Sequence, residues 1–146
     1  LIELIDYVIK TYEKIISKNN ISIKFNKTDN FKIIGDRDKL IEIFTNLIDN
    51  SIKYSDKNKE ITITAKKDGE FNTVSVADQG IGIPKESIHR ITERFFTVDP
   101  SKSRSVGGTG LGLAIVKHLV SQHRAEMDIN SIENKGTTID IKFNPL

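Results

Sequence analysis

The sequence predicts a two-layer α+β sandwich in which helices cover one face of a sheet. Apolar residues recur at helical spacing in three separate segments of the chain. Other segments alternate apolar and polar residues, and short turns typical of hairpins join two pairs of them. The length of 146 residues fits one domain. Its 37% apolar residues can supply a core without disulfides, since the chain has no cysteine.

The first elements follow directly from these patterns. Apolar residues at helical spacing predict a helix over residues 1–18, and alternation predicts a strand over 21–25. Asp36 is expected to cap a second helix over 37–54. The first part of the chain therefore supplies two helices and one strand.

The middle of the chain predicts a hairpin and a short helix. The alternating runs at 61–65 and 71–77 are joined by Asp68-Gly69, a dipeptide that favours a tight turn between strands. Pro84 is expected to open a short helix that ends near residue 91, because proline is well suited to the first turn.

The last part of the chain begins with a long polar segment. Residues 92–108 are rich in serine and glycine and contain Pro100. We expect a loop there of about seventeen residues, a length that usually marks a functional lid or disorder. A helix over 111–123 and two strands over 127–132 and 137–143 complete the predicted fold.

Composition excludes several classes of function. The formal net charge is +2, so no general attraction to nucleic acids or membranes is indicated. Without cysteine there is no thiolate metal site or thiol catalysis, and the three histidines lack metal-site spacing. No apolar run approaches the ~20 residues of a membrane-spanning helix, and the first residues lack a signal-peptide pattern. We therefore expect the chemistry to be that of a bound ligand.

A polar stripe on the helix over 37–54 is the first candidate site. Asn46, Asn50 and Lys53 lie along one face with Glu42, opposite a broad apolar face, and Tyr54 lies at the edge. Two carboxamides one turn apart offer neutral oxygens to a hydrated cation or to phosphates. A solvated face is the alternative, but asparagine is a poor helix former that such faces seldom use.

Two glycine-rich segments are the other candidates. Asp78 follows a strand and can accept a hydrogen bond from an exocyclic amine, while Gly80 and Gly82 allow close approach to a ligand. A tight turn capped by Asp78 explains that segment equally well. Four glycines within 107–112 open the last helix, where free backbone amides and the helix dipole favour an anion. The spacing is not that of a Walker motif.

Together these motifs resemble the catalytic and ATP-binding domain of sensor histidine kinases, in the superfamily of Bergerat-fold ATPases and kinases. The likeness extends from residue 1 to about 144 and looks closest to phosphate-regulon-type sensor kinases. The asparagine box, first glycine box, phenylalanine box and second glycine box of that family correspond to residues 38–55, 78–84, 91–96 and 107–112.

The resemblance implies a Bergerat fold with a mixed, mainly antiparallel sheet, and one catalytic domain over 1–146 with an ATP lid at about 92–108. It implies that Asn50 coordinates Mg²⁺ and forms a catalytic set with Asn46 and Lys53. Asp78 would accept a hydrogen bond from the adenine amino group. The other nucleotide contacts that it implies are Lys53, Tyr54, Gly80, Gly82, Ile83, Gly108, Thr109, Gly110, Leu111, Gly112 and Thr137.

The lid departs from the family pattern at two positions. Thr92 stands where the family has the first phenylalanine of its box, and Thr97 stands where a basic residue is usual. A lid contact to the γ-phosphate then falls to Arg94, Lys102 or Arg104. The same two threonines favour an alternative, a degenerate module that binds a nucleotide or a partner without kinase activity.

The function implied by the resemblance is transfer of the ATP γ-phosphoryl group to a histidine on a separate dimerisation domain. This chain contains no such acceptor motif. The implied partners are ATP, that dimerisation domain and, through the whole kinase, a response regulator, without nucleic acid or direct membrane contact. The implied location is cytoplasmic, with the parent kinase anchored in the cell membrane.

Two relatives within the superfamily are disfavoured. ATP-hydrolysing machines of the gyrase, mismatch-repair or chaperone type place a catalytic glutamate one turn before the magnesium-binding asparagine. That position is Asn46 here, and a carboxamide does not take a proton from water. A serine-kinase regulator of a sigma factor fits the C-terminal part of the chain less well.

Overall fold

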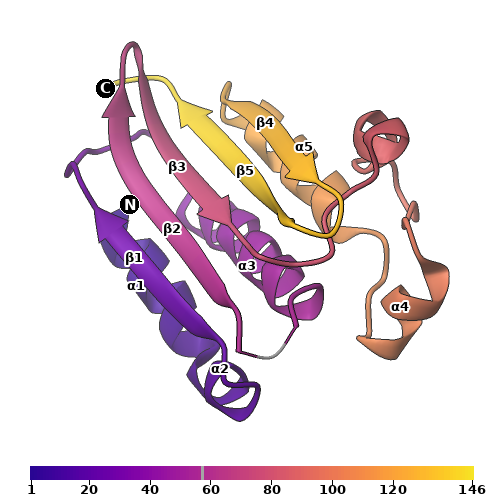
Figure 1. Cartoon of the computed structure of the whole chain (residues 1–146). Coiled ribbons are helices and arrows are strands. Elements are labelled where there is room, and N and C mark those ends of the chain that lie inside the picture. Colours follow the sequence, from indigo (N-terminus) through magenta and orange to yellow (C-terminus); the bar gives the residue numbers. More distant parts are fainter. Residues whose placement is uncertain (57) are drawn as a thin grey trace.

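The computed structural model describes residues 1–56 and 58–146. Within them, five strands form one sheet in the order β1–β2–β3–β5–β4 (Figure 1). The strand β1 (Ser22–Lys27) runs parallel to β2 (Glu60–Asp68). The neighbours that follow, β3 (Phe71–Ala77), β5 (Gly136–Phe143) and β4 (Glu126–Ile132), are antiparallel. The expected mixed, mainly antiparallel sheet is confirmed.

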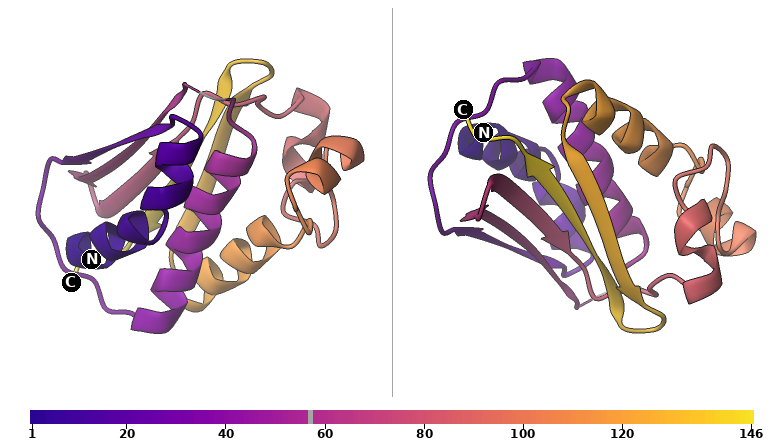
Figure 2. Two further views of the ribbon diagram at one scale, coloured as in Figure 1. Left: turned by 90° about the horizontal axis from the view of Figure 1, so that it is seen from below. Right: turned by 90° about the horizontal axis from the view of Figure 1, so that it is seen from above.

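Helices α1 (Ile2–Thr11), α3 (Arg37–Lys53) and α5 (Gly112–Gln122) cover one face of this sheet (Figures 1 and 2). The figures show that the opposite face carries no helix from the described part of the chain. The core lies between the two layers, where Phe44 of α3 and Ile63 of β2 are fully buried. Each such side chain contributes roughly 1.5–3 kcal/mol of burial free energy. The predicted two-layer sandwich is confirmed.

Helix α3 forms as the sequence predicts. The Asp36 carboxylate caps it by accepting a hydrogen bond of 3.1 Å from the Lys39 amide. Ile43, Phe44 and Leu47 are at most 1% exposed and fix the helix against the sheet. The polar stripe is therefore directed away from the core.

The predicted helix over 1–18 is wrong in one respect, because it breaks into α1 and α2 (Glu13–Lys18) at Tyr12. The Tyr12 amide bonds to the Ile9 carbonyl, three residues back, and Thr11 donates its hydroxyl to the Tyr7 carbonyl. Hydroxyl bonds of this second kind often bend helices. The Tyr12 hydroxyl also donates to Asp49 on α3, a tertiary contact that local periodicity does not reveal.

The segment expected to be a loop over 92–108 contains a short helix, α4 (Pro100–Ser105). The Asp99 carboxylate caps it through the amides of Ser101 and Lys102, and proline occupies its first turn. Before it, η1 (Lys85–Arg90) follows Pro84 as expected. Figure 1 shows α4 beyond the sheet, beside the start of α5. Among the described residues, no helix is long and apolar enough to cross a membrane.

Candidate functional site

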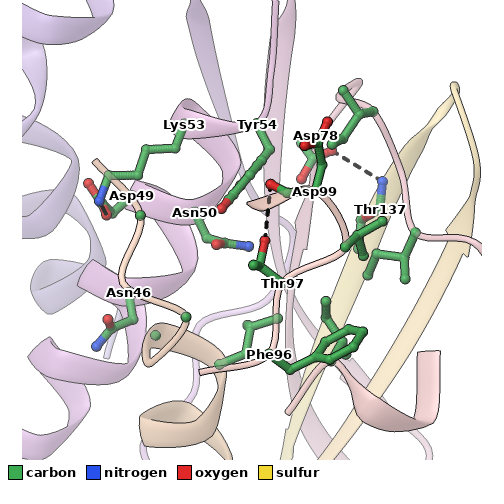
Figure 3. Close-up of a pocket in the computed structure, with 18 of the residues that line it drawn as sticks. Asn46, Asp49, Asn50, Lys53, Tyr54, Asp78, Phe96, Thr97, Asp99 and Thr137 are labelled. Atoms are coloured by element: carbon green, nitrogen blue, oxygen red, sulfur yellow. Dashed lines mark hydrogen bonds and ion pairs between the residues drawn. The ribbon is translucent and has the colours of Figure 1, made fainter. Parts of the chain in front are cut away.

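A cavity of about 120 Å³ lies between the end of α3, the segment after β3, the segment before α4 and the start of α5 (Figure 3). Its walls combine polar side chains with apolar ones such as Ile83, Ile91 and Leu113. Figure 3 shows Asn50 and Tyr54 pointing toward the middle of the cavity, where Thr97 and Asp99 lie. Segments that are far apart in the sequence therefore meet here.

Helix α3 supplies one wall. The Asn46 amide group donates to the Glu42 carbonyl at 2.8 Å, and its oxygen faces α5, because a Cβ on Gly112 would lie 3.3 Å from it. The Lys53 ammonium lies 2.8 Å from the Asp49 carboxylate. Asn50, between them in the sequence, completes a wall of two carboxamides and one cation.

The end of α3 is bound to the segment after β3. The Ile81 amide donates to the Tyr54 carbonyl at 3.1 Å, and Gly80 lies against that same carbonyl. A Cβ at position 80 would overlap the carbonyl oxygen, so glycine is required there. Gly80 thus permits this approach without lining the cavity itself.

Asp78 follows β3 and is the acidic group of the far wall. Its carboxylate accepts hydrogen bonds from the backbone amides of Gly80 at 2.9 Å and Thr137 at 3.2 Å. Burial raises the pKa of the Asp78 carboxyl above its usual value, and bonds from these amides and from the Ser51 hydroxyl lower it only in part. Asp78 is therefore a partly desolvated acceptor in the lining of the cavity.

Thr137 meets Asp78 because their strands are neighbours. In the antiparallel pair of β3 and β5, Ala77 lies opposite Thr138, so the residues next to them in the chain lie side by side. The Asp78 amide donates to the Thr137 carbonyl at 2.8 Å, and Figure 3 shows the two side chains on the same wall.

The glycine-rich segment before α5 closes the cavity. The Lys53 ammonium contacts the Gly107 carbonyl at 3.4 Å, and the Phe95 amide donates to the Gly110 carbonyl at 2.8 Å. Gly110 has φ +71°, and a Cβ there would lie 2.8 Å from Phe95 Cα. The start of α5, with its free amides and helix dipole, faces the cavity beside Asn46.

The structure brings together all the site residues expected from the sequence except Gly80 and Leu111, which do not line the cavity. The basic candidates Arg94, Lys102 and Arg104 also lie outside its lining. The roles of the lining residues stay predictions.

Several lining residues were missed by the sequence analysis. Asp49 has a signal, since it stands four residues before Lys53, the spacing of a helical ion pair. Asp99 has one too, because it precedes Pro100 as a cap precedes a helix. Phe96 and Thr97 were expected only as part of the lid segment, and the path of the chain before α4 brings them into the cavity lining.

The residues present fit a magnesium ion that arrives with phosphates. No group of three histidine or acidic side chains that could hold a metal ion occurs in the part of the chain that the structure describes. Asn50 offers a neutral oxygen, while Asp49 beside it is engaged by Lys53 and Tyr12. Mg²⁺ keeps several waters and needs few protein ligands when phosphates supply the rest.

Residues 35–146 match the family described as histidine kinase-, DNA gyrase B- and HSP90-like ATPase. The chain belongs to this family. Each of the four segments expected to be boxes of a sensor histidine kinase contributes residues to the cavity lining.

Relatives within this ATPase family are named as sensor kinases. The chain is 43% identical over 111 residues to the phosphate regulon sensor protein PhoR of Pseudomonas aeruginosa, covering 76% of this chain and 25% of PhoR. It is 34% identical over 140 residues to the sensor-like histidine kinase SenX3 of Mycolicibacterium smegmatis, covering 96% of this chain and 36% of SenX3. The expected likeness to phosphate-regulon sensors is confirmed, and the chain spans about a third or less of these relatives.

Solved structures of histidine kinases are also similar to this chain. The catalytic domain of histidine kinase ThkA in a nucleotide-free form has a TM-score of 0.84 and 29% identity, covering 99% of this chain and 91% of ThkA's. A complex of ThkA with the response regulator TrrA gives 0.80 and 27%, covering all of this chain and 40% of that one. Full-length ShkA in complex with AMPPNP gives 0.83 and 25%, covering 99% and 30%.

Proposed function

We propose that this chain is the catalytic, ATP-binding domain of a sensor histidine kinase, spanning residues 1–146 with an ATP lid at about 92–108. The observation that supports it is the meeting of Asn50, Lys53 and Asp78 with the start of α5 around one cavity. A base acceptor then lies on one wall and phosphate-binding groups lie on the others. That is the layout that a nucleoside triphosphate requires.

Each wall has a distinct task in this proposal. Asp78 accepts a hydrogen bond from the adenine amino group, next to Thr137, Gly82 and Ile83. The Lys53 ammonium, held at the rim by Asp49, neutralises phosphate charge, and Tyr54 contacts the nucleotide beside it. The triphosphate binds the amides of residues 108–112 at the positive end of α5.

Asn50 would hold a magnesium ion bound to the phosphates, with Asn46 next to it. When bound, Mg²⁺ supplies neutralisation of the charge that develops during phosphoryl transfer. The protein contributes position and fixed dipoles, which are the main sources of catalysis in this reaction. Because Asn46 is a carboxamide, the wall contains no general base there for attack by water, and transfer is favoured over hydrolysis.

The acceptor in this proposal is a histidine on a separate dimerisation domain, and a response regulator receives the phosphoryl group from the whole kinase. The ThkA–TrrA complex supports the second partner. The domain itself works in the cytoplasm, as part of a parent kinase that is anchored in the cell membrane.

Phosphoryl transfer to a dimerisation domain tests the proposal. The 146-residue chain is mixed with Mg-ATP and the dimerisation domain of its kinase, and acid-labile phosphate is followed. We expect phosphohistidine with the wild type and at least a ~10-fold slower reaction with Asn50→Ala, since positioning of the phosphates is lost. ATP binding, measured by calorimetry, should be strengthened by Mg²⁺ only in the wild type.

Asn130→Ala is the matched control, because Asn130 is exposed on β4 and lies outside the cavity lining. It should leave both transfer and magnesium dependence unchanged. ATP binding without any phosphohistidine would refute the kinase assignment and favour the degenerate module. An effect of Asn130→Ala equal to that of Asn50→Ala would refute the magnesium role of Asn50.

A further inference from the structure

A hydroxyl behind the cavity wall joins three parts of the fold. Ser131, near the end of β4, does not line the cavity. Its hydroxyl accepts a hydrogen bond from the Ile83 amide at 2.8 Å and donates to the Gly136 carbonyl at 3.0 Å. It also lies 2.8 Å from the Thr137 hydroxyl, a contact in which either oxygen can be the donor.

The single proton of the Ser131 hydroxyl determines which oxygen is the donor in its contact with Thr137. A hydroxyl has one proton and two lone pairs. The Gly136 carbonyl can only accept, so it takes the proton of Ser131, and the Ile83 amide can only donate, so it takes one lone pair. The one arrangement that satisfies all three contacts has Thr137 donating its proton to the remaining lone pair of Ser131.

This arrangement fixes what Thr137 offers to a ligand. With its proton directed at Ser131, the Thr137 oxygen has only lone pairs left for the cavity that it lines. Asp78, on the same wall, is also an acceptor, and its carboxylate already binds the Thr137 amide. The corner formed by Asp78 and Thr137 therefore presents acceptors only.

We propose that Ser131 is a positioning residue for base selection, which orients the Thr137 hydroxyl so that this corner accepts an amino group and repels a carbonyl. The inference rests on the proposed binding of a nucleoside triphosphate. Ser131 touches no ligand and acts through Thr137 and through Ile83, another lining residue whose amide it anchors.

Comparison of two nucleotides tests the proposal. Inosine triphosphate has a carbonyl where ATP has the amino group and is otherwise closely similar. In Ser131→Ala the Thr137 hydroxyl loses its acceptor and is free to turn and donate to a carbonyl. Calorimetry with Mg²⁺ should show ATP affinity falling about 5- to 10-fold, while inosine triphosphate affinity changes less than about 2-fold. The preference for ATP then falls.

Two further variants separate this role from a structural one. Ser131→Thr keeps the hydroxyl and should keep the wild-type preference. In a Thr137→Val background, which has no hydroxyl to orient, Ser131→Ala should leave the preference unchanged. Equal weakening of both nucleotides by Ser131→Ala in the wild-type background would overturn the proposal, because that is the effect of a general loss of structure. A preference altered by Ser131→Ala in the Thr137→Val background would overturn it as well, because no Thr137 hydroxyl is left there to orient.

The possible failures are distinguishable. Wild-type protein that binds neither nucleotide contradicts the proposed function itself, and the inference falls with it. If Ser131→Ala does not fold, as judged by thermal unfolding, the Thr137→Val variant by itself tests the proposal. Removing the oriented acceptor should lower the preference for ATP, and an unchanged preference would overturn the role given to Ser131.

Discussion

Asp78 combines its proposed role in binding with a penalty in stability. Burial raises the pKa of its carboxyl in the folded chain. A raised folded pKa stabilises the fold only at pH values below the unfolded pKa, and that contribution is lost as pH rises through the folded pKa. As pH rises above the unfolded pKa, Asp78 therefore lowers the free energy of unfolding, and the hydrogen bonds that its carboxylate accepts from the Gly80 and Thr137 amides offset this in part.

Asp78→Asn should thus separate stability from binding. Asparagine keeps an oxygen for the amides of Gly80 and Thr137 and removes the buried charge, so we expect an equal or higher Tm. Its NH₂ group would face the adenine amine, so ATP affinity should fall about 10-fold or more. Thermal unfolding and calorimetric titration with Mg-ATP measure the two effects.

Asp140→Asn is the matched control. Asp140 lies on β5 outside the cavity lining, where its carboxylate accepts a bond from the Ser75 hydroxyl, and asparagine can keep that bond. This variant should bind ATP like the wild type. ATP affinity unchanged by Asp78→Asn would contradict the adenine role of Asp78.

The sequence identified most single residues of the site because their chemistry is unusual in its local setting. Asn46 and Asn50 are poor helix formers on the polar stripe of a helix, and Asp78 stands two residues before the first of two closely spaced glycines. Ser131 gave no such signal. Its importance arises from the pairing of β4 with β5, which brings it to Thr137, and a serine in a strand is otherwise ordinary.

A helix or strand could be predicted from the sequence where the pattern of its buried face alone determines its conformation. Helix α3 has a capping aspartate and a continuous buried face, so periodicity sufficed to predict it. The break at Tyr12 depends on a bond to α3, and α4 is too short for periodicity to reveal. Only the Asp99-Pro100 pair indicated where α4 begins. Short or interrupted helices of this kind are determined by caps and by tertiary contacts.

The proposed lid, residues 92–108, is attached to the rest of the site through the bond from the Phe95 amide to the Gly110 carbonyl, which gives a second prediction. Gly110→Ala places a Cβ against the Phe95 backbone in a left-handed conformation, and strain of this kind is worth about 1–3 kcal/mol. We expect the bond from the Phe95 amide to the Gly110 carbonyl to open. Hydrogen exchange at the Phe95 amide should become faster, while amides of the central strand β3 keep their protection.

Gly107→Ala is the control for the backbone conformation alone. Gly107 has φ +77°, close to that of Gly110, but a Cβ there meets no atom within 4 Å. It should disturb exchange at Phe95 much less. Equal acceleration in both variants would mean that backbone strain, and not contact with Phe95, loosens the lid.

At the scale of the whole molecule, a chain of contacts joins the N-terminal helices to the lid. The Tyr12 hydroxyl donates to Asp49, Asp49 pairs with Lys53 at 2.8 Å, and Lys53 reaches the Gly107 carbonyl. Both ends of this chain lie far from Asp49 in the sequence. No pattern within a single segment reveals it, because it exists only once α1 and α2 are placed against α3.

The contact between Tyr12 and Asp49 predicts a specific loss of stability at high pH. Burial, together with the charge of Asp49 and the hydrogen bond to it, raises the pKa of Tyr12 to about 12. An unfolded tyrosine titrates near 10. The buried, neutral Tyr12 therefore stabilises the fold fully below about pH 10, and this contribution is lost as pH rises through about 12, where burial and the Asp49 charge both act against the ionised hydroxyl.

Tyr12→Phe should flatten that loss. The free energy of unfolding, measured by urea titration between pH 8 and pH 12, should fall less steeply in the variant than in the wild type. At pH 8 the variant should be less stable, since Asp49 loses its hydroxyl partner. Lysines are the same in both proteins, so the difference between the two curves isolates Tyr12.

Tyr7→Phe is the control, because Tyr7 is 55% exposed and packs against Arg37. Its curve should parallel that of the wild type, and a Tyr12→Phe curve that does the same would show that Tyr12 does not tie α1 and α2 to the site.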